Sequence, residues 1–495
     1  MTSPSASAPS TLTAFRQIDA HPLTRNQKSL IGLAVVGNVA EFFDMFLVGF
    51  VVALLAGAWS LTGPEMGAIL ACSGLGTVLG SVTWGRLSDS LGRRESLACC
   101  IVMFTGFTAA SALLPDGAWL LFALMRVGVG FGVGGLNIVS IPYVQEFVPS
   151  RQRGFLSGLA SSFIPAGLML GSISQGIVGD DWRLLLGLGA APIALLAWVA
   201  RVPQSPVTLM ARGREDEARA SVAWALQIPV EQVGPLSASS GSGSDASVHA
   251  GTHADACAGT TANAGAESDP TSPPKRPSAE RDERAQRRGI GGVLRCHLRP
   301  LVVIAAGSFC FMMGSFAIQS WGQTLLREAY GLGVRDVALA FGCVAICDML
   351  GRLGCARLAD AIGRKLTLLI FGLLGAAGCA WVALFHDTAW SFFAGILVIM
   401  TFGDGAFGIL NAFGAEQFPT SVRSTALGLG YGLGATAKIV GPALVGALVG
   451  GSAISQGVSM EGVGIAFTLF GAFLAAGALM YQLARETRGK SLESL

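Results

Sequence analysis

Charged side chains are scarce in this sequence: Asp, Glu, Lys and Arg make up 13% of its 495 residues, whereas apolar residues make up 52%. A water-soluble globule of this length would lack enough polar surface to cover itself, so we expect lipid to surround most of the chain. The net charge of +2 carries no information about nucleic acid, because the positions of charges matter more than their sum. We expect no nucleic-acid partner.

Histidine and cysteine give little sign of catalysis or metal binding. His249, His253 and Cys257 recur at a four-residue spacing that could bind metal on a helix, but in this low-complexity sequence we attribute the spacing to chance. None of the five histidines lies deep in an apolar run, so a proton relay within the membrane must use carboxylates. Eight of the ten cysteines lie in or beside apolar runs, as small apolar side chains do, and form no disulfide framework. Without a nucleophile–base pair or a set of metal ligands, we expect no enzyme, no cofactor and no metal site.

Long apolar runs, in contrast, are abundant. A bilayer core of roughly 30 Å needs about 20 apolar helical residues to span it, and twelve segments meet that length. The sequence therefore predicts an all-α membrane protein with twelve transmembrane helices. We expect them over residues 29–57, 66–86, 96–114, 118–145, 154–178, 183–200, 301–325, 337–356, 366–385, 389–415, 423–449 and 463–484.

Two phrases that each occur twice indicate an internal duplication. The run of ten residues from Gly85 is repeated from Ala356, 271 residues later (356 − 85), and both copies lie between apolar runs. The phrase Glu-x-x-Pro-x-x-x-Arg begins at Glu146 and again at Glu416, 270 residues later (416 − 146). Two similar membrane halves are the architecture of a transporter, so we expect two pseudo-symmetric six-helix bundles.

The remaining segments surround these bundles. We expect an N-terminal tail over 1–28, the first bundle over 29–200, a linker over 201–299, the second bundle over 300–484 and a C-terminal tail over 485–495. Within the linker, residues 236–289 are expected to be largely disordered, because most of this stretch has almost no large apolar side chains to bury.

Lysine and arginine set the expected orientation. They gather in the loops that share a side with both termini, and the opposite loops hold few of them. The positive-inside rule therefore predicts cytoplasmic termini and a cytoplasmic linker. The apolar run 29–57 is too long for a cleaved signal sequence, so we expect it to be retained. We expect a monomeric multi-pass protein of a bacterial inner membrane.

Few polar or ionisable groups interrupt the apolar runs of the first half. A charge at mid-bilayer costs on the order of 3 kcal/mol and persists mainly where it lines a cavity or finds a partner. Asn38, Glu41 and Asp44 recur at steps of three and share a helix face, as do Arg126 and Asn137 on another helix. Asp44 or Glu41 is a candidate proton acceptor with Arg126 as its charge partner; the alternative is a static buried ion pair.

The second half carries its own set of polar residues. Asp348 and Arg352 are four residues apart, and we expect a structural pair on the helix surface near the cytoplasmic end. Further polar groups interrupt the tenth and eleventh spans. The expected substrate-binding residues of both halves are Asn38, Arg126, Asn137, Gln319, Asp404, Asn411 and Lys438.

At these motifs the chain resembles the major facilitator superfamily, over every part except the N-terminal tail and the low-complexity insert. The signature loop of that superfamily, Gly-x-x-x-Asp-x-x-Gly-Arg-Arg, is matched from Gly85 to Arg94. The resemblance implies a cytoplasmic gating network of ion pairs that break when the two halves rock. Its expected members are Gly85, Asp89, Gly92, Arg93, Arg94, Glu146, Arg153, Asp360, Gly363, Arg364, Glu416 and Arg423.

Within the superfamily, the chain resembles two branches at different motifs. Sugar porters are similar in Pro203-Gln204-Ser205-Pro206, in the tail 486–493, and in an Asp opposite an Arg, but their paired glutamines of span 7 are reduced to Gln319. Aromatic-acid and related metabolite:proton symporters resemble the chain at Glu41-Phe42-Phe43-Asp44 and in an Arg followed by alternating glycines. Their span-11 arginine would fall at Ala435, and the cation here is Lys438.

Arg126 and Lys438 come from opposite halves, and two cations near a central cavity suit an anion better than a neutral substrate. We therefore expect proton-coupled symport of a small organic acid, aromatic or a short carboxylate, by alternating access. A sugar or polyol proton symporter is the alternative within transport, and drug export is a further one. A non-transporting sensor built on the same fold would explain the long insert.

Overall fold

The computed structural model describes residues 14–149, 163–236, 297–418 and 423–487. All regular structure in these ranges is helical, apart from one isolated bridge between Thr62 and Ala453. Eleven helices are long and apolar enough to cross a bilayer, and a shorter apolar helix, α7 (Ile164–Val178), occupies the place of the fifth predicted span. The predicted all-α membrane fold with two six-helix bundles is confirmed; residues 150–162, where the fifth span was expected to begin, lie outside the described residues.

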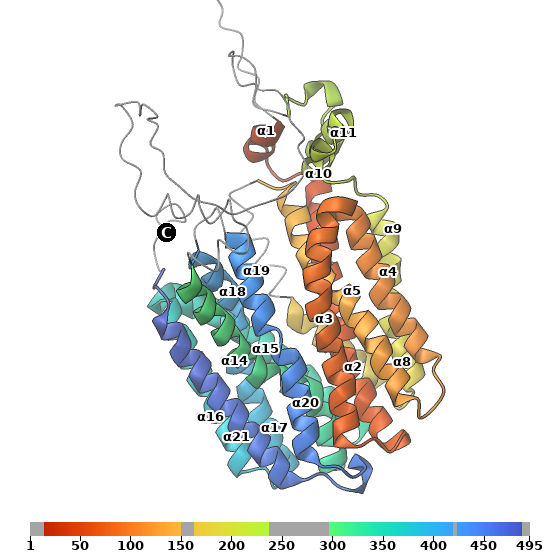
Figure 1. Cartoon of the computed structure of the whole chain (residues 1–495), viewed down its shortest axis with the longest axis vertical. Coiled ribbons are helices and arrows are strands. Elements are labelled where there is room, and N and C mark those ends of the chain that lie inside the picture. The colour runs from red at the N-terminus through yellow and green to blue at the C-terminus, as the bar shows by residue number, and fades with distance from the viewer. Residues whose placement is uncertain (1–13, 150–162, 237–296, 419–422, 488–495) are drawn as a thin grey trace, which may run out of the picture.

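Figure 1 shows the first bundle, coloured red to yellow, beside the second, coloured green to blue. The first bundle consists of α2 (Arg25–Ala58), α3 (Gly63–Leu91), α4 (Arg93–Ala112), α5 (Trp119–Gln145), α7, and a sixth span made of α8 (Trp182–Gly189), η2 (Ala191–Ala194) and α9 (Leu195–Val199).

The second bundle contains three spans with irregular turns. It consists of α14 (Leu298–Thr324) with η4 (Leu325–Ala329), α15 (Val334–Ile362), α16 (Arg364–Leu384), α17 (Ala389–Val398) with η5 (Ile399–Asp404) and α18 (Phe407–Glu416), α19 (Arg423–Gly434) with α20 (Ala437–Val449), and α21 (Met460–Met480).

The duplicated sequence phrase forms the same turn in both bundles. Gly92 ends α3 and begins α4 with φ 99° and ψ 157°, and Gly363 joins α15 to α16 with φ 104° and ψ 157°. Positive φ angles of this size are readily available only to glycine. The two glycines therefore fix the direction in which the following helix leaves each loop.

Close helix contacts explain the alternating glycines of α5. A Cβ atom on Gly130 would lie 2.2 Å from the carbonyl oxygen of Ser73, and one on Gly134 would lie 2.2 Å from that of Thr77. Helices α3 and α5 thus touch through their backbones, as small residues allow in membranes. A similar contact joins the two bundles, because a Cβ on Gly63 of α3 would lie 2.4 Å from the carbonyl oxygen of Gly446 in α20.

The eleventh span is interrupted one turn before the lysine that we predicted to face the cavity. Helix α19 ends at Gly434 and α20 begins at Ala437, whereas Pro442 lies within α20. The hydroxyl of Thr436 donates to the carbonyl oxygen of Leu433 at 2.6 Å, which competes with the regular helix pattern. The tenth span is also irregular, because η5 is a π-helix, a feature that often marks functional sites.

The ends of the linker and tail that the structure describes are folded onto the first bundle. Helices α1 (Ala14–Ala20), α10 (Pro206–Ala211) and α11 (Glu215–Leu226) share a small apolar core. The Thr24 hydroxyl donates to the carbonyl oxygen of Ala225 at 2.5 Å. The segment expected to be disordered, 236–289, lies outside the described residues after position 236.

Candidate functional site

The predicted charge pair of the first half is present and deeply buried. Asp44 of α2 and Arg126 of α5 are 0% and 1% exposed, and Arg126 Nη1 lies 3.7 Å from Asp44 Oδ2. The Thr108 hydroxyl donates to Asp44 Oδ1 at 2.6 Å and accepts from Arg126 Nη2 at 3.2 Å. A second hydroxyl, that of Ser111, accepts from Nη2 at 3.4 Å. The two opposite charges therefore neutralise one another, and two hydroxyl groups form hydrogen bonds to them.

One carboxylate oxygen of Asp44 interacts with Arg126 electrostatically, without a hydrogen bond. Asp44 Oδ2 and Arg126 Nε make no hydrogen bond within the part of the chain that the structure describes. Asp44 can consequently exchange a proton at Oδ2 without losing its bond to Thr108. That geometry suits a proton acceptor better than a permanent bidentate ion pair would.

The other predicted residues of α2 are buried close by. Asn38 accepts a bond from the Ser140 hydroxyl at 3.5 Å, and Glu41 lies within electrostatic reach of Lys438 in the opposite bundle. The side chain of Asn137 lies outside the described residues. The shared face expected for Asn38, Glu41 and Asp44 is thus directed into the protein and away from lipid.

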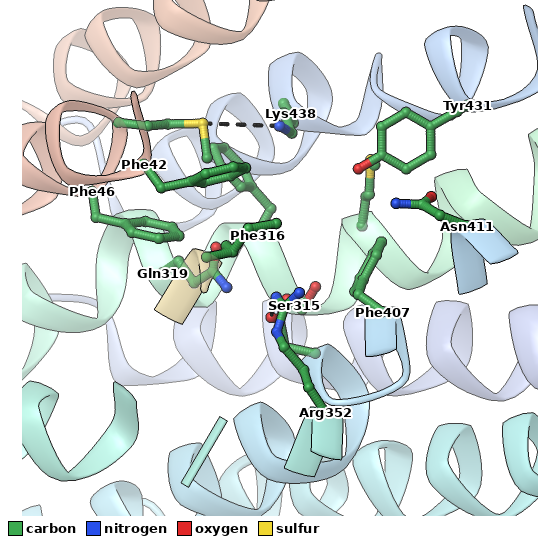
Figure 2. Close-up of a pocket in the computed structure, with 14 residues that line it drawn as sticks. Phe42, Phe46, Ser315, Phe316, Gln319, Arg352, Phe407, Asn411, Tyr431 and Lys438 are labelled. Atoms are coloured by element: carbon green, nitrogen blue, oxygen red, sulfur yellow. Dashed lines mark hydrogen bonds and ion pairs between the residues drawn. The ribbon is translucent and has the colours of Figure 1, made fainter. Parts of the chain in front are cut away.

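A pocket of about 460 Å³, open solvent included, lies between the two bundles and is lined by residues of both. Figure 2 shows Phe42, Phe46 and Phe316 toward one end of it and Phe407 and Tyr431 toward the other. Four predicted substrate-binding residues line it, namely Gln319, Asp404, Asn411 and Lys438. Asn38 and Arg126 are not among its described lining residues.

Lys438 is the cation at the junction of the two halves. Its Nζ lies 5.2 Å from the centre of the Phe316 ring and 3.8 Å from the sulfur of Met45, which belongs to the other bundle. Lys438 forms no ion pair with any described residue. The break between α19 and α20 places it in the first turn of α20, facing the pocket.

The interpretation of Asp348 and Arg352 as a helix-surface pair is wrong. Helix α15 continues to Ile362, so Asp348 lies halfway along it, and the two residues are only 1% and 5% exposed. Arg352 Nε donates to Asp348 Oδ1 at 3.0 Å, and its Nη2 donates to Asp404 of η5. Two carboxyls and one guanidinium therefore form a buried cluster, of which Arg352 and Asp404 line the pocket.

The loops at the duplicated turns form matching networks, each within one bundle. Arg93 Nε lies 3.3 Å from Glu146 Oε1, and Arg364 Nε lies 3.6 Å from Glu416 Oε2. Arg364 also pairs with Asp360 at 3.4 Å. Arg94 instead donates from Nε to the carbonyl oxygen of Val199 at 3.2 Å. Of the other predicted members, Gly85 lies within α3, and the side chains of Asp89, Arg153 and Arg423 lie outside the described residues.

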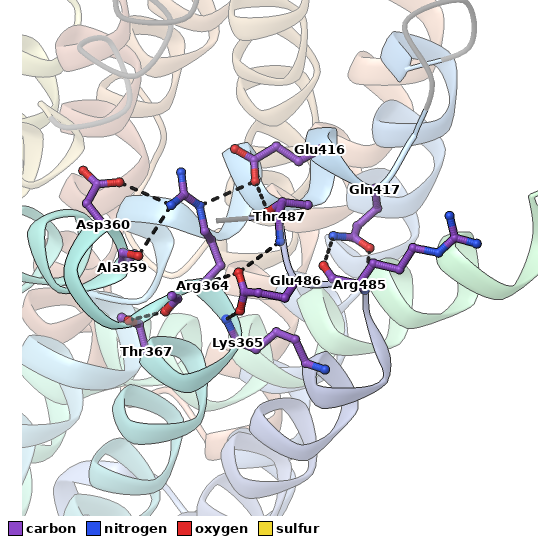
Figure 3. A network of polar contacts seen from close by, with 11 residues as sticks. Ala359, Asp360, Arg364, Lys365, Thr367, Glu416, Gln417, Arg485, Glu486 and Thr487 are labelled. Atoms are coloured by element: carbon purple, nitrogen blue, oxygen red, sulfur yellow. Dashed lines mark hydrogen bonds and ion pairs between the residues drawn. The ribbon is translucent and has the colours of Figure 1, made fainter. Parts of the chain in front are cut away.

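Two motifs that the sequence analysis did not assign to this network complete it. In the first bundle, Gln204 Oε1 accepts from the backbone N–H of Arg94 at 3.1 Å, and the Ser205 hydroxyl donates to Glu146. In the second, Glu486 Oε1 accepts from the N–H of Arg364 at 3.1 Å, and Thr487 donates to Glu416 (Figure 3). Both motifs follow the last span of a bundle, which is the signal that could have paired them.

These features define a multi-pass membrane protein that transports small molecules. The chain belongs to the Major Facilitator Superfamily, whose model matches residues 34–442 and, in a second match, 305–493. A niacin transporter of Acinetobacter baylyi is 27% identical over 490 residues, which cover 97% of this chain and 98% of that protein. A gallate transporter of Pseudomonas putida is 26% identical over 476 residues, covering 94% and 93%.

A solved structure shares the fold over most of the chain. It is the xylose transporter XylE of E. coli in a partially occluded inward-open conformation. The two structures superpose with a TM-score of 0.69 and 17% sequence identity, over 94% of this chain and 100% of that one. At this identity the likeness concerns the fold alone.

Proposed function

We propose that this protein carries a small aromatic carboxylate across the membrane together with a proton, by alternating access. The observation that carries the proposal is the pocket between the bundles, which is lined by five aromatic residues and by Lys438, a lysine with no ion pair to any described carboxylate. Aromatic rings stack favourably on a planar substrate ring, and the ammonium of Lys438 offers a counter-charge to its carboxylate. Niacin and gallate, named for two relatives, are both aromatic carboxylates.

Proton coupling is proposed for Asp44, with Glu41 as a second candidate. Asp44 is buried beside Arg126 and has one oxygen without a hydrogen bond in the described ranges. Movement of the bundles would alternately expose this carboxyl to either side of the membrane. We also propose that the protein works as a monomer in a bacterial inner membrane, with cytoplasmic termini and linker. Lysine and arginine gather in the loops that share a side with both termini, and the positive-inside rule supports a cytoplasmic position for such loops.

A sugar or polyol remains the second candidate, because the pocket also carries the amides of Gln319 and Asn411 and the hydroxyl of Ser315. Hydroxyl recognition needs several such groups, whereas most of the pocket wall is aromatic or apolar. A relative named polyol transporter 5, from Arabidopsis thaliana, is 31% identical over 35% of this chain.

Thermal unfolding of the purified protein with added ligands tests the choice. A ligand at 100 times its dissociation constant stabilises the folded state by about 2.7 kcal/mol. We expect niacin and gallate to raise the melting temperature and nicotinamide, which has the same ring as niacin without its charge, to have little effect. Stabilisation by xylose or sorbitol, with none by the carboxylates, would overturn the proposal in favour of the sugar or polyol.

A further inference from the structure

The buried cluster of the second bundle has an excess of one negative charge. Asp348, Arg352 and Asp404 supply two carboxyls and one guanidinium, and each residue is at most 5% exposed. Arg352 donates to both carboxyls, so one buried guanidinium holds the two acids side by side. Two buried carboxyls that share a single cation do not both ionise readily, so one of the two favours holding a proton.

The backbone holds the two carboxyls together. A Cβ on Gly351 of α15 would lie 2.0 Å from the carbonyl oxygen of Thr401 in η5, and one on Gly408 would lie 2.4 Å from that of Arg352. Helix α15 and the tenth span therefore approach as closely as two backbones can. Asp404 is the last residue of the π-helix Ile399–Asp404, and its side chain pairs with Arg352 at this contact.

The surrounding charges make the proton sensitive to the substrate. Lys438 of α20 lies within electrostatic reach of Asp404, and Tyr431 of α19 within reach of both Arg352 and Asp404. On α15 itself, the thiols of Cys347 and Cys355 lie within electrostatic reach of Asp348 and Arg352 respectively. Lys438 is the only cation in this group besides Arg352, so an anion bound to it removes positive charge from the vicinity of Asp404.

We propose that Asp348 and Asp404 form a second proton site, in which the two carboxyls share one proton that binds and leaves together with the substrate anion. The proton arrives from water through the pocket, forms one O–H bond to a carboxyl oxygen, and is released to water by breaking that bond. An anion on Lys438 raises the proton affinity of the pair, and by linkage the proton raises the affinity for the anion. The transport part of this inference rests on the proposed function, whereas the shared proton does not.

Infrared spectroscopy of the purified protein tests the shared proton without any substrate. Near neutral pH we expect the C=O band of a buried protonated carboxyl, lost in both Asp348→Asn and Asp404→Asn. The control is Asp336→Asn, at the exposed start of the same helix, which should keep the band. Absence of the band from the parent, or its persistence in both variants, would overturn the proposal even if niacin transport is normal.

Transport in proteoliposomes tests the coupling. Asp404→Asn should move one proton fewer per niacin than the parent, and niacin binding should depend less steeply on pH in that variant. An unchanged proton count in Asp404→Asn, or niacin uptake that follows a sodium gradient and loses this dependence in the variant, would refute the second proton site. If niacin does not bind to the parent at all, the proposed function fails, and the infrared result alone decides whether the pair holds a proton.

Discussion

The two halves of this transporter repeat one scaffold but bury different charges. In the first half, the charges of Asp44 and Arg126 neutralise one another, and neither residue is among the described lining of the pocket. In the second half, Arg352 forms ion pairs with two aspartates at the pocket wall. The positions 271 residues before Asp348 and Arg352 hold Thr77 and Ser81, so the first half has no counterpart of this charge pair.

The duplicated loops, in contrast, kept both residues and geometry. Arg93 pairs with Glu146 as Arg364 pairs with Glu416, and the glycine before each arginine has almost the same backbone angles. The comparison teaches that the two halves share the ion pairs of their duplicated loops, whereas the buried charges are particular to each half.

The largest expected effect is a difference in thermal stability between variants of the two buried charge sites. Arg352→Gln leaves two buried carboxyls without their cation, and breaking a buried pair costs about 3–5 kcal/mol. We expect a strongly lowered melting temperature or loss of folded protein. Arg126→Gln should cost less, because Asp44 keeps its bond to Thr108 and can be neutralised by one proton. Equal losses of thermal stability in the two variants would remove the distinction between the sites.

Asp44→Asn should remove one of the two coupled protons, so that accumulation driven by a pH gradient falls steeply, and should spare exchange of substrate across the membrane. An amide keeps the shape of the side chain but cannot bind and release a proton. Accumulation and exchange of labelled niacin in proteoliposomes measure the two properties separately. If the variant accumulates niacin as well as the parent, proton coupling must be assigned to Glu41 or to the cluster of the second half.

Lys438→Gln should weaken binding of niacin by about tenfold or more, equivalent to at least about 1.4 kcal/mol. The substitution removes the counter-charge but keeps a polar side chain of similar length. Calorimetric titration with niacin and with nicotinamide makes the comparison, since the amide has no charge to lose. An equal loss for both ligands would show that Lys438 supports the pocket and does not recognise the carboxylate.

The smallest effects are expected in the duplicated loops, where the ion pairs are partly exposed. Glu146→Gln and Glu416→Gln should each lower the transport rate a few-fold, because such pairs are worth up to about 1 kcal/mol. Ligand-induced thermal stabilisation should be unchanged in both, since the loops lie away from the pocket. A large asymmetry between the two variants would contradict the shared mechanical role.

The sequence predicted helices and paired charges better than it predicted the pocket. The length of the apolar runs predicted every span that the structure describes. The predicted pairing of Asp44 with Arg126 is present as an ion pair of 3.7 Å. The apolar run ended before α15 does, which is why Asp348 was misplaced near a helix end. The aromatic wall was missed because which face of a helix meets the pocket depends on helix rotation, and a helix apolar all round gives no signal of it.

The central claim is that an aromatic carboxylate moves together with protons through the pocket between the two halves. Uptake of labelled niacin into proteoliposomes with an imposed pH gradient, acidic outside, tests it most directly. We predict accumulation above the outside concentration that collapses when a protonophore removes the gradient, and no uptake of xylose under the same conditions. Niacin uptake that only equilibrates, with or without the gradient, would contradict proton coupling, and xylose uptake without niacin uptake would contradict the substrate class.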